Sequence, residues 1–295
     1  MSRAGFVALI GEPNAGKSTL FNRLLGQALA AVTRRPQTTR FQIPGILNRE
    51  GVQYIFVDTP GWVASPRNAW HRLLTRQSLA AAKEADACVW VVSARAPSLE
   101  VAEEVGSFLA EAPALIGAIT HLDLYPSGER ETRFQALQAQ LTEWPIQTCL
   151  DASLDRPLEP LLEAIAAFLP ESPPLYPPDQ LTTLPVRFFV AEILREVLYT
   201  HLREELPYGT EVDITQYQET PERDYIYATI FVEKESHKPM VIGAKGQMIK
   251  KIGTEARKKI EAFLEKPVFL QLYVKLAPDW RDSMVRLRHL GYRVS

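Results

Sequence analysis

The sequence predicts an α/β domain with a mostly parallel six-stranded sheet, followed by a small α+β domain. Three observations support this prediction. Up to about residue 171, apolar strand-like runs alternate with helix-like segments, as in sheets covered by helices on both faces. A proline-dense stretch then interrupts the pattern, and beyond it the order becomes helix, two strands, helix and strand. We place the domains at residues 1–171 and 184–295, with a linker at 172–183.

The first domain contains six apolar runs of strand length, separated by segments with helical periodicity. The second and third runs flank the turn-forming segment 48–51, so we expect an antiparallel hairpin at one side of the sheet. The predicted strands are residues 6–10, 41–47, 52–57, 87–92, 114–120 and 146–149, and the helices begin near Lys17, Asn68, Leu99, Gly128 and Pro157.

The composition limits the cellular compartment and the class of protein that we expect. The 295 residues carry a net charge of −2 and are 46% hydrophobic, as in an ordinary globular protein. The two cysteines fit neither a metal-binding nor a disulfide pattern, and Cys88 lies in an apolar run that predicts a buried thiol. We see no signal peptide and no apolar run of membrane-spanning length. We therefore expect a cytoplasmic protein whose contact with the inner face of the cell membrane, if any, is peripheral.

The segment between the first strand and the first helix is the most informative. It is bounded by glycines and ends in Lys-Ser, which is the pattern of a phosphate-binding P-loop. Glycines let the backbone approach phosphate closely, and the N–H groups at the helix start attract negative charge. A chance glycine loop is the alternative, against which the flanking strand and helix argue. The residues expected to bind phosphate are Gly11, Glu12, Pro13, Asn14, Ala15, Gly16, Lys17, Ser18 and Thr19.

Two further segments predict a magnesium–nucleotide site. Asp58-Thr59-Pro60-Gly61 ends an apolar strand, where Asp58 can hold magnesium through water and the Gly61 N–H can donate to a γ-phosphate. A threonine of Gln37-Thr38-Thr39-Arg40 can complete the magnesium shell when a triphosphate is bound. A common turn and a plain surface loop are the alternatives. We expect Ser18, Thr39 and Asp58 to hold Mg²⁺.

The second domain carries a pattern typical of RNA binding. Gly243-Ala244-Lys245-Gly246 opens a basic helix at 247–264, like the RNA-clamping loop of a KH domain. Residues 238–259 contain seven Lys and Arg residues and a single acidic residue, Glu255. Two of these basic residues, Lys250 and Lys251, lie shortly after the loop. A solvated charged helix with a capping glycine loop is the alternative.

The order of elements in the second domain supports this interpretation. We predict a long amphipathic helix at 186–206, alternating strands at 211–217 and 225–233, and a last strand at 268–276. This order matches the prokaryotic type of KH fold, type II. Trp280 is predicted to be a packing anchor.

Taken together, these motifs resemble the translation-factor-related GTPases, and among them the ribosome-assembly GTPases that end in a KH domain. The resemblance extends over essentially the whole chain. It implies hydrolysis of GTP to GDP with Mg²⁺ as cofactor. It also implies a monomer that binds the 3′ end of small-subunit ribosomal RNA and the 30S subunit, and assists RNA processing and subunit assembly.

The base-reading motif of these GTPases, Asn-Lys-x-Asp, is matched here by Thr120-His121-Leu122-Asp123. Asp123 can pair with the N1–H and 2-amino groups of guanine, whereas Thr120 lacks the two-sided amide of asparagine. The last nucleotide motif, Ser-Ala, is matched by Asp151-Ala152, and Ala152 is the retained residue. We predict weaker GTP binding than is usual in the family, with GTP preferred over ATP. An RNA-binding factor with little GTPase activity and an ATPase remain alternatives.

Trp62 occupies the position at which some GTPases have a glutamine that orients the attacking water. Asn14 matches an asparagine that helps hold K⁺ in related GTPases, and a loop-stabilising hydrogen bond is its other interpretation. We therefore expect slow, potassium-stimulated hydrolysis with Asn14, Lys17, Thr39 and Gly61 as the catalytic residues.

Overall fold

The chain folds into two compact units. The computed structural model describes residues 2–33, 35–63, 66, 68–95, 103–112 and 114–292. The N-terminal unit comprises Met1–Ala30, Thr39–Arg67 and His71–Thr183. The C-terminal unit comprises Leu184–Ser295 together with two short segments from earlier in the chain, Ala31–Thr38 and Asn68–Trp70.

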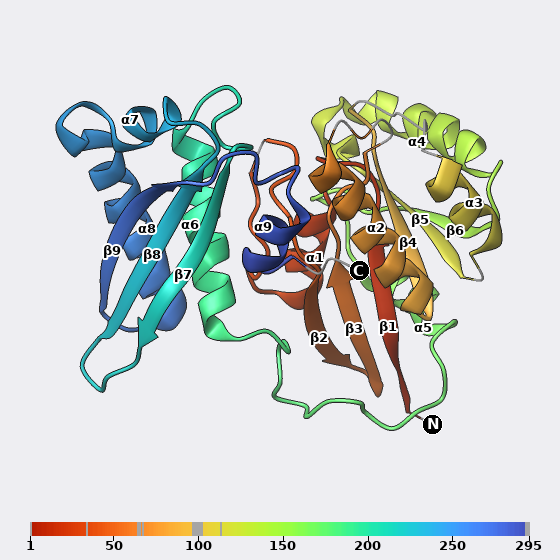
Figure 1. Cartoon of the computed structure of the whole chain (residues 1–295). Helices are drawn as coiled ribbons and strands as arrows, with labels where there is room; N and C mark the ends of the chain where they lie inside the picture. Colours follow the sequence, from red (N-terminus) through yellow and green to blue (C-terminus); the bar gives the residue numbers. More distant parts are fainter. Residues whose placement is uncertain are drawn as a thin grey trace. The chain divides into compact units, whose positions relative to one another are not determined.

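A six-stranded sheet forms the centre of the N-terminal unit, in the order β2-β3-β1-β4-β5-β6 (Figure 1). All neighbouring strands are parallel except β2 and β3, which form an antiparallel hairpin. The predicted mostly parallel sheet is thus confirmed, although β2 begins two residues later than expected. The strands are β1 Arg3–Ile10, β2 Ile43–Arg49, β3 Val52–Asp58, β4 Ala87–Ser93, β5 Leu115–Thr120 and β6 Ile146–Asp151.

Helices cover both faces of this sheet. One face packs against α2, α3 and α4 through a buried cluster that is dominated by aromatic and branched side chains. The other face packs against α1 and α5. The helix start expected near Leu99 lies outside the described residues, and α3 is described from Glu103. The helices are α1 Lys17–Leu25, α2 Ala69–Glu84, α3 Glu103–Glu111, α4 Ser127–Leu141 and α5 Glu159–Ala166, with a 3₁₀ turn, η1, at Leu122–Leu124.

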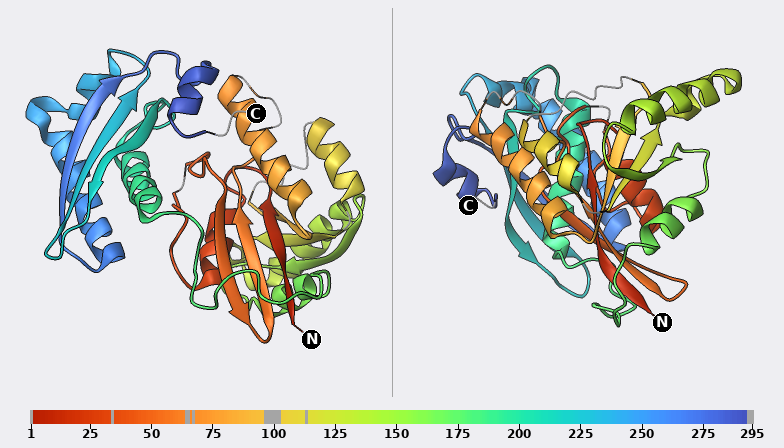
Figure 2. Two further views of the ribbon diagram at one scale, coloured as in Figure 1. Left: turned by 60° about the horizontal axis from the view of Figure 1, so that its bottom comes forward. Right: turned by 90° about the vertical axis from the view of Figure 1, so that its right-hand side faces the viewer.

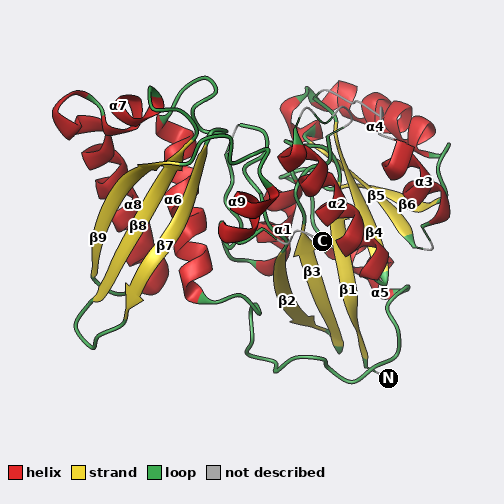
Figure 3. Cartoon of the chain, viewed as in Figure 1, coloured by secondary structure: helices red, strands yellow, loops and turns green. Residues whose placement is uncertain are grey.

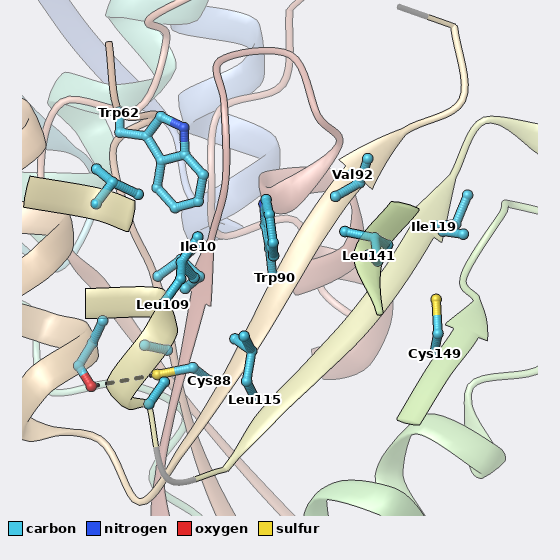
Figure 4. Close-up of a cluster of buried hydrophobic side chains, with 14 of the residues drawn as sticks. Ile10, Trp62, Cys88, Trp90, Val92, Leu109, Leu115, Ile119, Leu141 and Cys149 are labelled. Carbon is cyan, nitrogen blue, oxygen red and sulfur yellow. Dashed lines mark hydrogen bonds between the residues drawn. The ribbon is translucent and has the colours of Figure 1, made fainter. Parts of the chain in front are cut away.

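The cluster beneath α2, α3 and α4 contains both cysteines of the chain, together with Trp62 and Trp90 (Figure 4), and Trp144 packs against it. The ring centroids of Trp62 and Trp90 lie 6.0 Å apart, and those of Trp90 and Trp144 lie 5.8 Å apart. Cys88 is a free, buried thiol, as predicted, and burial raises its pKa to about 12. Because a thiol with such a pKa stays protonated, Cys88 is a packing residue.

The proline-rich segment 172–183 lies along the N-terminal unit as an ordered loop (Figure 3). The side chain of Gln53 on β3 donates to the carbonyl of Tyr176 (2.8 Å) and accepts from its N–H (2.9 Å). The N–H of Ile46 on β2 donates to the carbonyl of Leu181 (2.8 Å). These hydrogen bonds attach the predicted linker to the hairpin.

The C-terminal unit is a three-stranded sheet in the order β7-β8-β9 with helices α6 and α8 packed against it (Figure 2). β7 and β8 are antiparallel, whereas β8 and β9 are parallel. No helix in the described part of the chain is long and apolar enough to cross a membrane. The elements are α6 Val186–His201, β7 Thr210–Gln218, β8 Asp224–Val232, α7 His237–Ile242, the 3₁₀ turn η2 Ala244–Gly246, α8 Gln247–Leu264, β9 Val268–Leu276 and α9 Met284–His289.

The C-terminal unit differs from the predicted pattern in its helices. The helix expected to reach Leu206 ends at His201, because Leu202 adopts an extended conformation (φ −78°, ψ 154°) before a run of turns that contains Pro207. The short helices α7 and α9 were not predicted. Trp280 is fully buried and donates from its indole N–H to the carbonyl of Gly209 (3.2 Å), which confirms it as a packing anchor.

Candidate nucleotide site and nucleic-acid interface

The loop between β1 and α1 has a backbone that only glycine can supply at two positions. Gly11 has φ +145°, and a Cβ atom there would lie 2.4 Å from the carbonyl oxygen of Val91. Gly16 has φ +93° and caps the N-terminus of α1. The loop therefore wraps around the start of α1, where backbone N–H groups and the helix dipole favour a phosphate. Asn14 is exposed in this loop, at φ +63°.

The ammonium group of Lys17 lies inside the loop. It donates to the carbonyls of Gly11 (3.0 Å) and Glu12 (2.7 Å). Burial lowers the pKa of Lys17 to about 8, an effect that the charges of Asp58 and Glu12 partly oppose. Within the described part of the chain, this charged amine donates to neutral loop carbonyls, and it can exchange them for phosphate oxygens, which are charged and pair more strongly.

Three oxygen-bearing side chains from separate segments meet beside Lys17. The Ser18 hydroxyl donates to Oδ2 of Asp58 (2.7 Å) and lies 2.8 Å from the hydroxyl of Thr39. The Thr39 hydroxyl is also 3.3 Å from the same carboxylate oxygen. Thr38 instead contacts the hydroxyl of Thr33 (2.6 Å), so only one of the two adjacent threonines reaches this cluster.

This cluster fits a magnesium ion. Oδ1 of Asp58 is buried and has no hydrogen-bond partner among the described residues. Burial raises the pKa of Asp58 to about 6, against the lowering effects of the Ser18 hydrogen bond and the Lys17 charge. Mg²⁺ prefers oxygen ligands, and one or two side chains usually hold it together with substrate phosphates. Ser18, Thr39 and Asp58 would hold the ion, which supplies positive charge to the phosphates when it is bound.

The segment after Asp58 lies directly against the P-loop. The Thr59 hydroxyl donates to the carbonyl of Leu9 (2.7 Å), and a Cβ atom on Gly61 would lie 2.4 Å from the backbone nitrogen of Pro13. Trp62 is 1% exposed and belongs to the core cluster in Figure 4. Its side chain therefore anchors this segment in the core.

The predicted base-reading residues lie at the carboxyl ends of β5 and β6. The Thr120 hydroxyl donates to the carbonyl of Ala15 (2.7 Å), which ties β5 to the P-loop. His121 has φ +64°, and its Nδ1 lies 2.8 Å from the hydroxyl of Ser93. Burial lowers the pKa of His121, so this ring is neutral at physiological pH. Ala152 is buried, and its N–H donates to the carbonyl of Ile119 (2.8 Å).

Ser153 was not predicted to belong to this region. Its buried hydroxyl accepts from the N–H of Leu122 (2.9 Å) and so connects the loop after β6 to the turn that carries Asp123. The only sequence signal for it is a hydroxyl directly after the Asp151-Ala152 match. Asp151 caps the same loop by accepting from the Ser153 N–H (3.0 Å).

The glycine loop of the C-terminal unit has the conformation that its sequence predicts. Gly243 has φ +75°, and a Cβ atom there would lie 2.6 Å from Cβ of Met248. Gly246 has φ +76° and caps the N-terminus of α8. Between them, Ala244 and Lys245 are exposed. Both ends of the turn therefore need glycine, and its centre faces solvent.

Helix α8 separates an apolar face from a basic one. Ile252, Ala256 and Ile260 are fully buried against the sheet. Lys250 and Lys251 are exposed and follow the glycine loop directly. This arrangement places positive charge beside a turn that a phosphate backbone can approach closely.

Comparisons with protein families agree with this architecture. Residues 6–121 match the family model described as a 50S ribosome-binding GTPase. Residues 205–281 match the KH domain model. The fold and the two sites thus define a P-loop GTPase joined to a KH domain.

Individual relatives narrow the class further. The chain is 42% identical to GTPase Era of Nitratidesulfovibrio vulgaris over 98% of its length and 96% of that protein. It is 40% identical to GTPase Era of Bordetella avium, with 98% of both chains covered. The chain belongs to the Era family of GTPases.

Two solved Era structures are similar over the full chain. One is Era in complex with MgGDPNP and nucleotides 1506–1542 of 16S ribosomal RNA, with a TM-score of 0.91, 32% identity and full coverage of both chains. The other is Era of Aquifex aeolicus bound to GDP·AlF₄⁻, with a TM-score of 0.88, 31% identity, and coverage of 99% of this chain and 100% of that one.

Proposed function

We propose that the chain is a GTP-hydrolysing switch that binds the 3′ end of 16S ribosomal RNA and assists its processing and the assembly of the small subunit. The observation that carries the proposal is the meeting of Ser18, Thr39 and Asp58 from three separate segments. The relative that was solved with MgGDPNP and 16S ribosomal RNA supports both ligands.

The switch depends on the γ-phosphate. Thr39 approaches the site only through hydroxyl and carboxylate contacts, and Gly61 lies against Pro13 of the P-loop. Thr39 and Gly61 would contact a bound triphosphate and its Mg²⁺, so hydrolysis and loss of phosphate would remove the contacts that order them. The KH unit binds RNA through the loop at Gly243 and Gly246, with Lys245, Lys250 and Lys251 facing the backbone.

Hydrolysis is slow and is stimulated by potassium. The position after Gly61 holds Trp62, a buried indole that cannot orient water, so no side chain at this position replaces the missing glutamine. Asn14 is exposed in the P-loop, and we assign it as a ligand of a potassium ion near the phosphates. Asn14 would hold this ion, whose positive charge would add to that of Lys17 at the phosphates.

The proposal includes a cytoplasmic monomer that acts at the 30S subunit and whose contact with the inner face of the cell membrane is peripheral. The Era relative that was solved with nucleotides of 16S ribosomal RNA supports the ribosomal partner. Sedimentation velocity tests the monomer, and co-sedimentation with anionic lipid vesicles tests the membrane contact.

A second candidate is an RNA-binding assembly factor with weakened guanine specificity and little GTPase activity. The observation that favours it is the Thr120 hydroxyl, which is engaged with the carbonyl of Ala15 and therefore offers no donor to a base.

Hydrolysis of GTP and ATP in potassium or sodium buffer, with and without an RNA of the 16S 3′ end, separates these candidates. The switch predicts GTP hydrolysis that potassium and RNA accelerate. Hydrolysis that is equal in both buffers contradicts the role of Asn14. RNA binding without hydrolysis of either nucleotide favours the second candidate.

A further inference from the structure

Two loops border the side chain of Asp123, and one arginine is bonded to both. Asp123 lies in η1, the turn after β5. Arg130 of α4 donates from Nη2 to the carbonyl of Asp123 (2.9 Å) and from Nε to the carbonyl of Tyr125 (2.9 Å). Its Nη1 forms an ion pair with Asp155 in the loop after β6. Arg130 thus connects the two loops that carry the base-reading residues.

The carboxylate of Asp123 has an oxygen that could accept a hydrogen bond from a ligand. Oδ1 of Asp123 is buried, and no group in the described part of the chain forms a hydrogen bond with it. Buried polar atoms are nearly always satisfied, so an oxygen that receives no donor from the chain is a candidate acceptor for a ligand. The N1–H and 2-amino groups of guanine are such donors.

We infer that Arg130 is a positioning residue for guanine recognition. It acts through Asp123, because fixing the carbonyls of Asp123 and Tyr125 fixes the direction in which the carboxylate leaves the turn. The inference rests on the proposed function, since it concerns the base of the bound nucleotide. A planar guanidinium suits this task because its donors form a rigid fork that holds several acceptors at once.

Neighbouring contacts explain why the turn depends on this arginine. Thr120 holds the P-loop rather than the turn, through its single hydroxyl. Ser153 holds only the N–H of Leu122, on the side of the turn that precedes Asp123. Arg130 holds the side that follows it. A preorganised carboxylate binds the base more tightly because less freedom is lost on binding.

The test compares affinities for GTP and ITP, which differ only by the 2-amino group. The unmodified protein is expected to prefer GTP about tenfold, because a charged acceptor loses one hydrogen bond with ITP. Arg130→Met removes all three contacts while it keeps the aliphatic stem. We expect its ratio of GTP to ITP affinity to fall close to one, because GTP loses two hydrogen bonds to the carboxylate where ITP loses one.

Arg133→Met is the matched control. Arg133 lies three residues further along α4 and stacks on the Tyr125 ring, 3.9 Å from its centroid, with an ion pair to Glu129 (3.3 Å). Neither contact involves a backbone carbonyl of the turn, through which Arg130 acts, so the ratio should stay at the value of the unmodified protein. Arg130→Lys, which keeps the charge but not the fork, should give an intermediate ratio.

Equal losses of GTP and ITP affinity in Arg130→Met would mean a merely structural role and would overturn the inference. If circular dichroism shows that Arg130→Met is unfolded, an unchanged ratio in Arg130→Lys overturns it instead. Equal binding of GTP and ATP by the unmodified protein contradicts the proposed function itself, and the inference with it. That failure is recognisable because it precedes any substitution.

Discussion

The phosphate end and the base end of the nucleotide site are constructed differently. At the phosphate end, several side chains contact one another or the loop backbone, so the proposed binding of phosphate and Mg²⁺ does not depend on one of them alone. They are Lys17, Ser18, Thr39 and Asp58. At the base end, one carboxylate, Asp123, is the proposed contact to the base, and Ser153 and Arg130 hold only the backbone around it. The contrast indicates that phosphate binding withstands changes in the base motif, whereas base selectivity depends on one side chain and its supports.

Lys17→Ala should have the largest effect. The substitution removes a buried positive charge that would pair with the phosphates in the proposed site, so GTP hydrolysis should fall at least about 100-fold. Single-turnover hydrolysis measures the change. Lys83→Ala, at an exposed position in the last turn of α2, is the control and should hydrolyse GTP at the normal rate.

Asp123→Ala should abolish the distinction between GTP and ATP. GTP affinity should fall by about 10-fold to 100-fold, since two hydrogen bonds to a charged acceptor are lost, while ATP affinity should not fall. Calorimetric titration with both nucleotides measures this. A variant that still prefers GTP would show that the main-chain groups of the base end read guanine, and the contrast drawn above would be wrong.

The pH dependence of magnesium binding tests the role of Asp58 at the phosphate end of the site. Because the pKa of Asp58 is about 6, Mg²⁺ must displace a proton below that pH, and its affinity should fall about tenfold per pH unit. GTP-dependent fluorescence titrations with Mg²⁺ between pH 5 and pH 8 test this expectation. An affinity that is constant across this range contradicts it.

The same carboxyl has an effect of opposite sign on the stability of the unliganded protein. Its folded pKa of about 6 lies above the ordinary 3.8, so the folded state binds the proton more tightly than the unfolded state does. Stability should therefore decrease as pH rises between these two values, by up to about 3 kcal/mol. Thermal unfolding in EDTA measures the slope, and Asp58→Asn should flatten it.

Thr120→Asn should have the smallest effect. Asparagine can donate to the carbonyl of Ala15 as threonine does, and it keeps an amide oxygen for a second contact. One additional polar contact should raise GTP affinity by about 2-fold to 10-fold. Thr120→Ser keeps only the hydroxyl and should show no gain, so equal affinities of the two variants would refute this explanation.

Local patterns in the sequence were sufficient for the fold class and for the P-loop. Gly11 and Gly16 lie where backbone geometry demands glycine, and such demands are visible in eight consecutive residues. Thr39, rather than Thr38, is predicted from the sequence to complete the magnesium shell, and the Thr39 hydroxyl lies 3.3 Å from Asp58. This approach depends on how a whole segment folds back on the sheet, which eight consecutive residues do not show.

The supports of the base end could not be predicted. Arg130 and Asp155 are 25 residues apart, and Leu122 and Ser153 are 31 apart, so neither pair leaves a periodic signal. An arginine on an amphipathic helix is ordinarily a solvated side chain. The short helices α7 and α9 were not predicted for a related reason, since six residues are too few to show a helical period in the sequence.

The loop at residues 172–183 has a consequence for how the protein avoids aggregation. β2 is the outermost strand of its sheet, and an open strand of this kind invites pairing with another chain. Two backbone groups of β2 are covered by the loop. The N–H of Ile46 donates to the carbonyl of Leu181, and the carbonyl of Pro44 accepts from the hydroxyl of Thr182 (2.6 Å). These groups are therefore not available to the strand of another chain. A fragment ending at residue 171 exposes these groups, whereas one ending at residue 183 keeps them covered.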